Sequence, residues 1–378
     1  MNFEYSDEQR QLADSLRKVL ANDYTFEKRQ AIIASTGGVS DAVWATFAEM
    51  GLTSIAVPEA DGGFGGGAMD LMAAMEACGE ALVVEPLLDN IALGGRLVAR
   101  AGNAAQRGAL LPGLIAGSVK LALAYLEPGR RYELMPENTS AKREGGGGSG
   151  WMLDGRKSVV VGAASATKLI ASARTDAGAS LFIVDPAAAG VSLNPSRGVD
   201  GVRVADVRFA GVHLGADALL GAAGSALLHI DEAVDFATAL LCSDAVGAMR
   251  YANEATLEYT KTRKQFGTAI ASFQVLQHRM VEMLICWEQA RSMAILAAAK
   301  VDSAKDAAGA TERRRAVSAA KVKIADAARQ ISQESVQLHG GMGMTEELKI
   351  SHTFRRLTMI SQRFGDADHH LERYAAAG

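Results

Sequence analysis

The period of hydrophobic and polar positions changes twice along the chain. Apolar residues recur at helical spacing up to about residue 120. Short β-branched or alternating runs separated by turn residues follow between 121 and 221, which is typical of strands. Helical spacing then returns in longer runs. We therefore predict a mainly α protein with a central β domain: an N-terminal helical domain (1–120), a small antiparallel β domain (121–221) and a C-terminal four-helix bundle (222–378).

The C-terminal region indicates four helices of about 25 residues or more, joined by short connections. Within it, Phe273, Leu276, Met280, Leu284 and Trp287 keep the spacing of one helical face. We expect this stripe to be core rather than a cofactor-binding surface.

Two local signals refine this prediction. Ser6 and Gln9 have the spacing of a capping box, which indicates the start of a helix. The glycine-rich stretch EGGGGSG (144–150) lies between two strand-like runs and no helix follows it, so we expect a hairpin loop rather than a phosphate-binding loop.

Composition narrows the class of protein. The 378 residues are 49% hydrophobic and 22% charged, with a net charge of −4, which favours a soluble globular protein without a nucleic-acid or membrane partner. No apolar run is long enough to cross a bilayer, and the polar, acidic start MNFEYSDEQRQ resembles neither a secretory signal nor a transit peptide. The three cysteines, Cys78, Cys242 and Cys286, lie far apart in the sequence. We interpret them as buried thiols of a protein in a reducing compartment. We expect a cytoplasmic protein.

Two stretches near the C-terminus have a chemistry of their own. In TRKQFGTAIASFQ, Arg263 is a fixed cation with a forked set of donors suited to a pyrophosphate, Phe266 offers an apolar face, and Gly267 lets the chain turn. In QLHGGMGMTEE, Gly340 and Gly341 remove side chains, so that backbone can approach a ligand closely. Each stretch alone could be ordinary, a helix–turn–helix with a surface arginine or a Gly-Gly helix stop. The two in register favour a ligand site.

Both stretches resemble segments of the acyl-CoA dehydrogenase family of flavoenzymes, RxxFGxxIxxFQ and QxxGGxGxxxE. The segment AEMGLTSIAVPEADGGFGGG (48–67) is similar to the family's N-terminal GLxxxxxPExxGGxG. The resemblance therefore covers essentially the whole chain, including the three-domain architecture.

The resemblance implies FAD as cofactor, an acyl-CoA thioester as substrate and an oligomer as the working unit. The reaction would be α,β-desaturation, in which a carboxylate removes the α-proton, the β-hydrogen leaves as hydride to the flavin, and an electron-transferring flavoprotein accepts the electrons. In the family the two segments hold the pyrophosphate and adenine end of the FAD bound by the neighbouring subunit. The residues that carry this role over are Arg263, Phe266, Gln274, Gln337, Gly340 and Gly341.

The chain also departs from the family. The usual TEPxxGSD segment reads AYLEPGRRYEL, which keeps residues 127–129 but replaces the small polar residues with arginines and a tyrosine. The triplet that packs against the flavin, often Trp-Ile-Thr, is three valines at 159–161. The half of the site that would face this chain's own flavin is therefore altered.

The catalytic base is displaced or missing. The two positions where relatives carry it are occupied by Phe364 and Ala237. Asp366, two residues beyond the first position, is a candidate displaced base, and Asp244, two turns after Ala237, is a weaker one. Asp235 matches a position that contacts substrate in some relatives.

The C-terminal FGDADHH stretch gathers Asp366, Asp368, His369 and His370. Four such side chains in tandem cannot all face one ion from a single helix, although an i, i+3 or i, i+4 pair could. We expect no metal here, and a polar helix end.

Three interpretations remain. The chain is the small subunit of a heteromer whose larger acyl-CoA dehydrogenase paralogue supplies the base, a self-sufficient homo-oligomer with a displaced base, or a flavin-free scaffold. Groups that act on a neighbour's FAD are intact while those that act on its own are lost, which favours the heteromer. The run RRLTMISQRFGDADHHLERYAA also resembles small subunits of the pimeloyl-CoA dehydrogenase type.

Overall fold

The computed structural model describes residues 5–144 and 150–377, which form two compact units. One unit contains the described parts of Met1–Arg29, Gly67–Val83 and Thr238–Gly378, and the other contains Gln30–Gly66 and Val84–Ala237. The domain boundaries expected after residues 120 and 221 stay predictions. The loop expected at 144–150 lies almost entirely outside the described residues.

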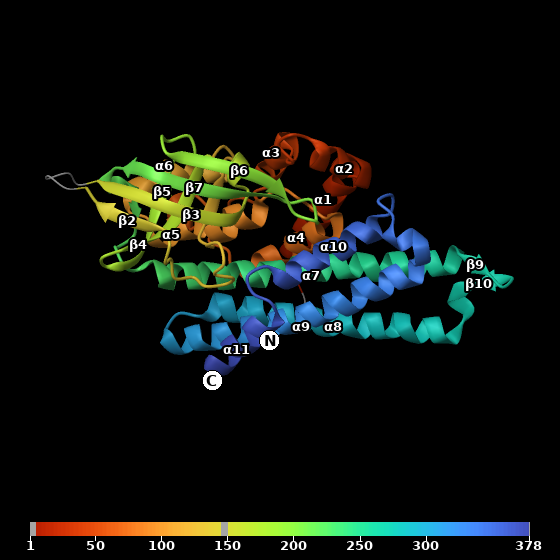
Figure 1. Ribbon diagram of the computed structural model, residues 1–378. Coiled ribbons are helices and arrows are strands. Elements are labelled where there is room, and N and C mark those ends of the chain that lie inside the picture. Colours follow the sequence, from red (N-terminus) through yellow and green to blue (C-terminus); the bar gives the residue numbers. More distant parts are fainter. Residues whose placement is uncertain (1–4, 145–149, 378) are drawn as a thin grey trace. The chain divides into compact units, whose positions relative to one another are not determined.

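Helices make up most of the first unit, and the second unit contains shorter helices and the large sheet (Figure 1). In chain order the α-helices are α1 (Asp7–Asp23), α2 (Phe26–Ala34), α3 (Asp41–Glu49), α4 (Ala68–Ala81), α5 (Arg96–Ala101), α6 (Ala104–Ile115), α7 (Ala226–Thr262), α8 (Gln274–Ser303), α9 (Ala307–His339), α10 (Lys349–Gln362) and α11 (Ala367–Ala376). Short 3₁₀ turns are η1 (Glu59–Asp61), η3 (Ala163–Ser165), η4 (Ala216–Ala218), η5 (Ile270–Ser272) and η6 (Gly340–Met344), and η2 (Asp89–Gly95) is π-helical.

The helix ends follow their local chemistry. The capping box of α1 is present, because the Ser6 side chain accepts from the Gln9 N–H and the Gln9 side chain accepts from the Ser6 N–H. The C-terminal helices α7, α8 and α9 span 37, 30 and 33 residues, but α10 spans only 14. Among the described residues, three C-terminal helices rather than four therefore reach the predicted length of about 25 residues. Phe364 and Gly365 have φ of +61° and +123°, which the right-handed helix does not allow, so the chain stops and restarts at α11.

The strands form one eight-stranded sheet and a separate small hairpin. The sheet contains β1 (Leu121–Ala124), β2 (Ser140–Arg143), β3 (Trp151–Val161), β4 (Lys168–Thr175), β5 (Gly178–Val184), β6 (Val191–Arg197), β7 (Arg203–Leu214) and β8 (Leu219–Leu220). Its order is β6-β7-β3-β2-β4-β5-β8, with β1 also paired to β4. Most pairs are antiparallel as predicted, but β1 and β2 both run parallel to β4.

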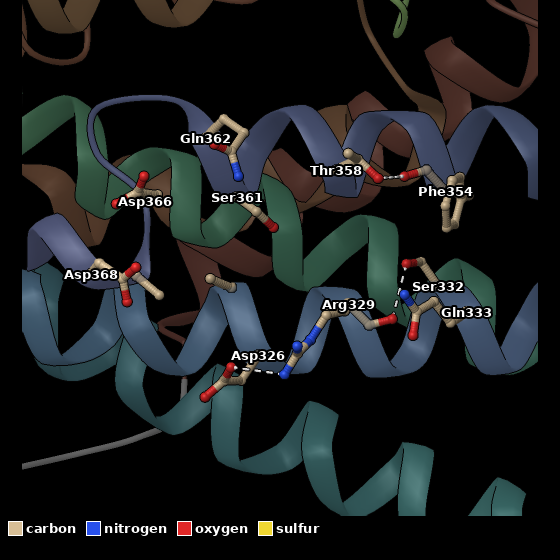
Figure 2. Close-up of a pocket in the computed structure, with 12 residues that line it drawn as sticks. Asp326, Arg329, Ser332, Gln333, Phe354, Thr358, Ser361, Gln362, Asp366 and Asp368 are labelled. Carbon is tan, nitrogen blue, oxygen red and sulfur yellow. Dashed lines mark hydrogen bonds and ion pairs between the residues drawn. The ribbon is translucent and has the colours of Figure 1, made fainter. Parts of the chain in front are cut away.

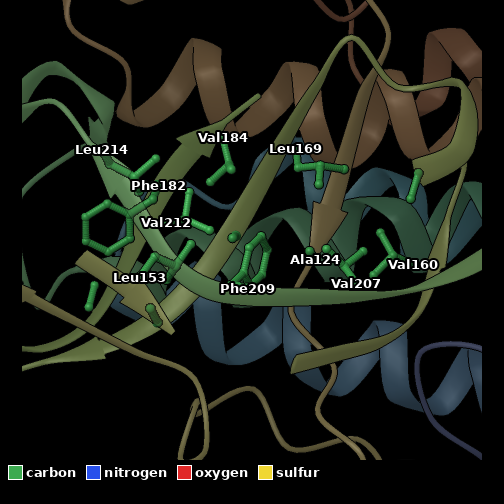
Figure 3. Packing of buried hydrophobic residues seen from close by; sticks show 14 of the residues in the cluster. Ala124, Leu153, Val160, Leu169, Phe182, Val184, Val207, Phe209, Val212 and Leu214 are labelled. Atoms are coloured by element: carbon green, nitrogen blue, oxygen red, sulfur yellow. The ribbon is translucent and has the colours of Figure 1, made fainter. Parts of the chain in front are cut away.

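The core of the sheet domain comes from the alternation that predicted the strands. Inward residues of β3, β4, β5 and β7, among them Leu153, Leu169, Phe182 and Val207, form one fully buried cluster (Figure 3). The mainly α fold with a central β domain is thereby confirmed. No helix of the described part of the chain is long and apolar enough to cross a membrane.

Candidate functional site

A two-stranded hairpin extends the chain beyond the end of α7. It is formed by β9 (Lys264–Gln265) and β10 (Thr268–Ala269), and its turn residues Phe266 and Gly267 have φ of +53° and +82°. Two consecutive positive φ values are typical of the type I′ turn that closes a two-residue hairpin. The turn carries Phe266 into solvent, where the side chain is 93% exposed.

Arg263 stands at the base of this hairpin with a fixed backbone and a free side chain. Its N–H donates to the carbonyl of Tyr259 (2.8 Å), and its own carbonyl accepts from Ile270 (2.9 Å). The residue is exposed, and its guanidinium has no ion pair or hydrogen bond within residues 5–144 and 150–377. A cation held in place and left unpaired is able to bind an anion.

The second predicted segment, at the end of α9, leaves backbone open. Gly340 has φ of +63°, and a Cβ built on Gly340 or Gly341 would meet nothing within 4 Å. Packing within the described chain therefore does not explain why residue 341 is glycine. Gln337 on the same segment is exposed.

The start of α8 adds a third feature. Its N-cap residue, Phe273, makes no side-chain cap, and Gln274 at the first helical position is exposed. An uncapped helix N-terminus favours anions. These groups fit the pyrophosphate of FAD: a forked cation, an uncapped helix start and accessible glycine backbone. We refer to Arg263, Phe266, Gln274, Gln337, Gly340 and Gly341 as the clamp residues; their role stays a prediction.

The exposed face of α8 was not predicted from the sequence. Leu284, expected in the core, is 49% exposed, and Val275, Val281 and Ile285 are also exposed. The face of α8 that packs inside is made instead by small and flexible residues such as Met283 and by alanines. A helix with apolar residues on opposite faces is typical of a buried position. The sequence signal for the second face of α8 was therefore that its apolar residues are not confined to one stripe.

The predicted polar helix end is a turn whose carbonyl groups are occupied. Lys321 on α9 is fully buried, and its ammonium donates to the carbonyls of Gly365 (2.7 Å) and Ser361 (3.1 Å). His370 Nε2 donates to the carbonyl of Phe364 (3.1 Å), and the Ser318 hydroxyl donates to Nδ1 (3.3 Å).

Burial sets the charge of both anchors. It lowers the pKa of His370 to about 2, helped by the positive charge of Lys321 nearby, so this imidazole is neutral at physiological pH. Burial also lowers the pKa of Lys321, to about 8, against the opposing effect of Cys242 and Asp366. The ring and the ammonium both serve to satisfy backbone carbonyls.

Asp366 caps α11 and borders a cavity. Its carboxylate accepts from the His369 N–H (2.9 Å), as an N-cap does. The cavity, of about 460 Å³, lies between α9, α10 and the start of α11, and Figure 2 shows Asp326, Asp366, Asp368 and Arg329 around it. Because carboxylates outnumber the arginine, this cavity does not suit phosphate groups. The described residues contain no cluster of three His, Cys, Asp or Glu side chains that could hold a metal.

Asp244 is held in a buried ion pair. Arg356 on α10 donates to both of its oxygens, at 2.5 and 3.2 Å, and Asp244 is 1% exposed. Because the bidentate pairing and the burial already engage this carboxylate, the geometry favours a structural role. Asp235 and Ala237 are fully buried on α7, and Phe364 is buried in its turn. Their assignments stay predictions.

Glu127, kept from the family's segment, has a structural task. It accepts from the N–H groups of Glu137, Asn138 and Thr139 and from the buried ammonium of Lys157 (3.0 Å). Burial opposes its charge, but these donors lower the pKa of Glu127 to about 2. The retained part of the motif therefore stabilises the sheet domain.

Two residues of the altered part of the motif region are exposed. Arg131 is exposed with φ of +47°, and Val159, first of the three valines, is 53% exposed with φ of +53° at an irregularity in the β3–β7 pairing. A β-branched residue at positive φ is unusual and marks local strain.

Comparison with known proteins matches all three parts of the chain. Residues 6–118, 122–212 and 229–377 match models of the acyl-CoA dehydrogenase N-terminal, middle and C-terminal domains. The acyl-CoA dehydrogenase FadE12 of Mycobacterium tuberculosis is 31% identical over 320 residues, which cover 82% of this chain and 80% of that protein.

Two solved structures are similar over nearly the full length. A chain of a variant of the steroid ACAD Tcur3481-Tcur3483 is 27% identical with a TM-score of 0.86, covering 98% of this chain and 97% of that one. A chain of the ChsE4-ChsE5 complex from Mycobacterium tuberculosis has a TM-score of 0.88 at 22% identity, covering 100% and 98%.

Proposed function

Because the chain belongs to the acyl-CoA dehydrogenase family of FAD-dependent oxidoreductases acting on CH–CH bonds, we propose that it is the small subunit of a heteromeric enzyme. A larger paralogue would hold most of the FAD and supply the carboxylate base. This chain would contribute the clamp residues, with Arg263 binding the pyrophosphate.

The observation that carries the proposal is the contrast between free and occupied groups. The Arg263 guanidinium has no partner within the described residues, and Gly340 and Gly341 face open space. Both usual base positions hold hydrophobic residues, and Asp244 is paired with Arg356. These features support a chain that binds a cofactor held by another subunit and takes its base from that subunit.

Exposed apolar surface supports an assembly. Val281, Leu284 and Ile285 on α8, with Phe266 at the hairpin tip, are apolar and accessible, and exposed apolar side chains of this kind are available for protein–protein contact. Two of the similar structures, Tcur3481-Tcur3483 and the ChsE4-ChsE5 complex, are named for two proteins each, which supports a heteromer for this chain as well.

The chemistry that bound FAD would supply is acceptance of the β-hydride of an acyl-CoA thioester. The residues of this chain would bind and orient the cofactor and keep water from it. We extend the proposal to an electron-transferring flavoprotein as acceptor and to a dicarboxyl-CoA of the pimeloyl type as substrate. None of the three cysteines forms a disulfide in the described residues, which supports a cytoplasmic location.

A homo-oligomer with Asp366 as displaced base is the second candidate. One observation favours it: Asp366 lies beside a cavity and is only partly buried, so its carboxylate is accessible.

The visible spectrum of the purified chain separates the two candidates. As a small subunit it should be colourless alone and gain flavin absorbance and acyl-CoA-dependent bleaching when co-expressed with a larger paralogue that carries the TEPxxGSD segment and a glutamate base. A chain that is yellow alone and bleached by acyl-CoA contradicts the heteromer and favours the homo-oligomer. A chain without flavin under either condition contradicts both.

A further inference from the structure

The two clamp segments are far apart in the sequence but meet at one side-chain contact. Tyr259 near the end of α7 and His339 at the end of α9 have their rings stacked, with centroids 4.3 Å apart and planes 24° from parallel. Tyr259 precedes Arg263 by one helical turn, and His339 directly precedes Gly340.

Tyr259 is coupled to the backbone of the first segment. Its carbonyl accepts the Arg263 N–H (2.8 Å) and the Thr262 hydroxyl (3.0 Å). A displacement of Tyr259 therefore moves the residue that carries the guanidinium.

His339 is fixed in one tautomer. Its Nδ1 lies 2.8 Å from the carbonyl of Ser335, which can only accept, so Nδ1 carries the proton. The ring is 5% exposed, and burial lowers its pKa, against the opposing effect of the Ser335 carbonyl. A neutral, immobile ring suits stacking on a phenol better than a charged ring that must keep its water.

Other contacts also link these helices. Arg279 on α8 pairs with Glu334 on α9 (2.5 Å), and the Thr260 hydroxyl contacts Met280 Sδ (3.4 Å). Loss of the ring stack would leave these links in place and release only the spacing between the two segment ends.

We propose that Tyr259 and His339 are positioning residues for the clamp: their stack sets the distance between Arg263 and the Gly340–Gly341 backbone, so that both reach one pyrophosphate. This inference rests on the proposed function, because it assumes that the two segments share the ligand. Neither ring has to touch FAD.

The test measures the Kd of FAD for the flavin-depleted assembled protein by flavin fluorescence. Tyr259→Leu and His339→Leu remove the stack but keep apolar volume, and each should weaken FAD binding roughly tenfold, the scale of an aromatic pair. Tyr259→Phe and His339→Phe keep a ring and should bind within about twofold of the parent. The double Leu variant should be no weaker than either single variant, because both remove the same contact.

Three outcomes overturn the inference: Leu variants that bind FAD as the parent does, Phe variants that lose as much as the Leu variants, or additive losses in the double variant. Circular dichroism and thermal melting of the flavin-free protein identify a variant that is unfolded. If one Leu variant is unfolded, the Phe variant at the same position and the Leu variant at the other position decide whether the stack positions the clamp. Arg263→Ala distinguishes a failure of the proposed function from a failure of the positioning role alone. If it leaves FAD binding unchanged, the proposed function fails; if it weakens binding while the ring variants do not, only the positioning role fails.

Discussion

Two regions of the C-terminal helices differ in whether their basic side chains have hydrogen-bond partners. At the hairpin, Arg263 is fixed by its backbone and unpaired within the described residues. At the turn before α11, Lys321 and His370 are buried and donate to backbone carbonyls. Both regions drew attention by their unusual residues, yet only the first offers unused binding capacity.

The difference teaches how to weigh a polar cluster. A buried polar group that has its hydrogen bonds contributes to one defined conformation, and removing its partner is costly. An exposed charge without a partner contributes little to the isolated chain, so its presence needs another reason. The following variants each change either a group that has its hydrogen-bond partners or an exposed charge that has none within the described residues.

Glu127→Gln should have the largest effect. It leaves the Lys157 ammonium buried without its counter-charge, and we expect a loss of about 3 kcal/mol in the free energy of unfolding. Urea unfolding measures it, with the exposed Glu133→Gln as the matched control. Equal stability of the two variants would mean that Glu127 is not a structural partner of Lys157.

Arg263→Ala should lower the affinity of the assembled protein for FAD by about 10- to 100-fold, the value of charge-assisted hydrogen bonds to a phosphate. The melting temperature of the flavin-free protein should stay unchanged, because the guanidinium has no partner within the described chain. Arg208→Ala, another exposed arginine, is the control. A large loss of stability with intact FAD binding would reverse the contrast drawn above.

His370→Gln should change the pH dependence of stability. The folded-state pKa of about 2 lies below the ordinary value of 6.5, so between these values the unfolded state binds the proton and the folded state does not. His370 therefore makes the parent lose about 1.4 kcal/mol per pH unit as pH falls below 6.5, a slope that the variant lacks. Denaturant unfolding at pH 7, 6 and 5 measures it, and parallel curves would refute the buried, neutral imidazole.

Asp366 offers the smallest and sharpest change. Asp366→Asn keeps a good N-cap and should alter stability by less than about 0.5 kcal/mol, whereas Asp366→Ala should cost about 1 kcal/mol. Turnover of the assembled enzyme should be unaffected by the Asn variant. A loss of turnover at unchanged stability would instead make this carboxylate the displaced base.

Much of the fold was accessible from the sequence because its signals are local. Alternation predicted the strands, and the Ser6–Gln9 pair predicted the start of α1. The break between α10 and α11 also had a local signal, Gly365 followed by Asp366, a glycine stop and an N-cap. The parallel pairing of β1 with β4 had none, since pairing depends on residues distant in the sequence.

For the candidate site, residue types were predictable and partners were not. The sequence could not show that Asp244 meets Arg356, because that contact depends on how closely the helices approach. The contact between α4 and α7 is another example of such close approach. There a Cβ on Gly79 or Gly247 would lie 1.9 Å from a carbonyl oxygen of the facing helix. The Tyr259–His339 stack depends in the same way on tertiary packing.

The hairpin tip has a consequence for how such a chain evolves and is engineered. Phe266 adopts a left-handed backbone conformation that costs a non-glycine residue roughly 1–2 kcal/mol, and its exposed ring gains no burial in the single subunit. Selection for expression or heat resistance of this chain alone would favour Gly or Asn at position 266. If the chain is a small subunit as proposed, such a screen would enrich sturdier proteins with a weaker clamp, so variants should be ranked by FAD binding in the assembled protein as well as by stability.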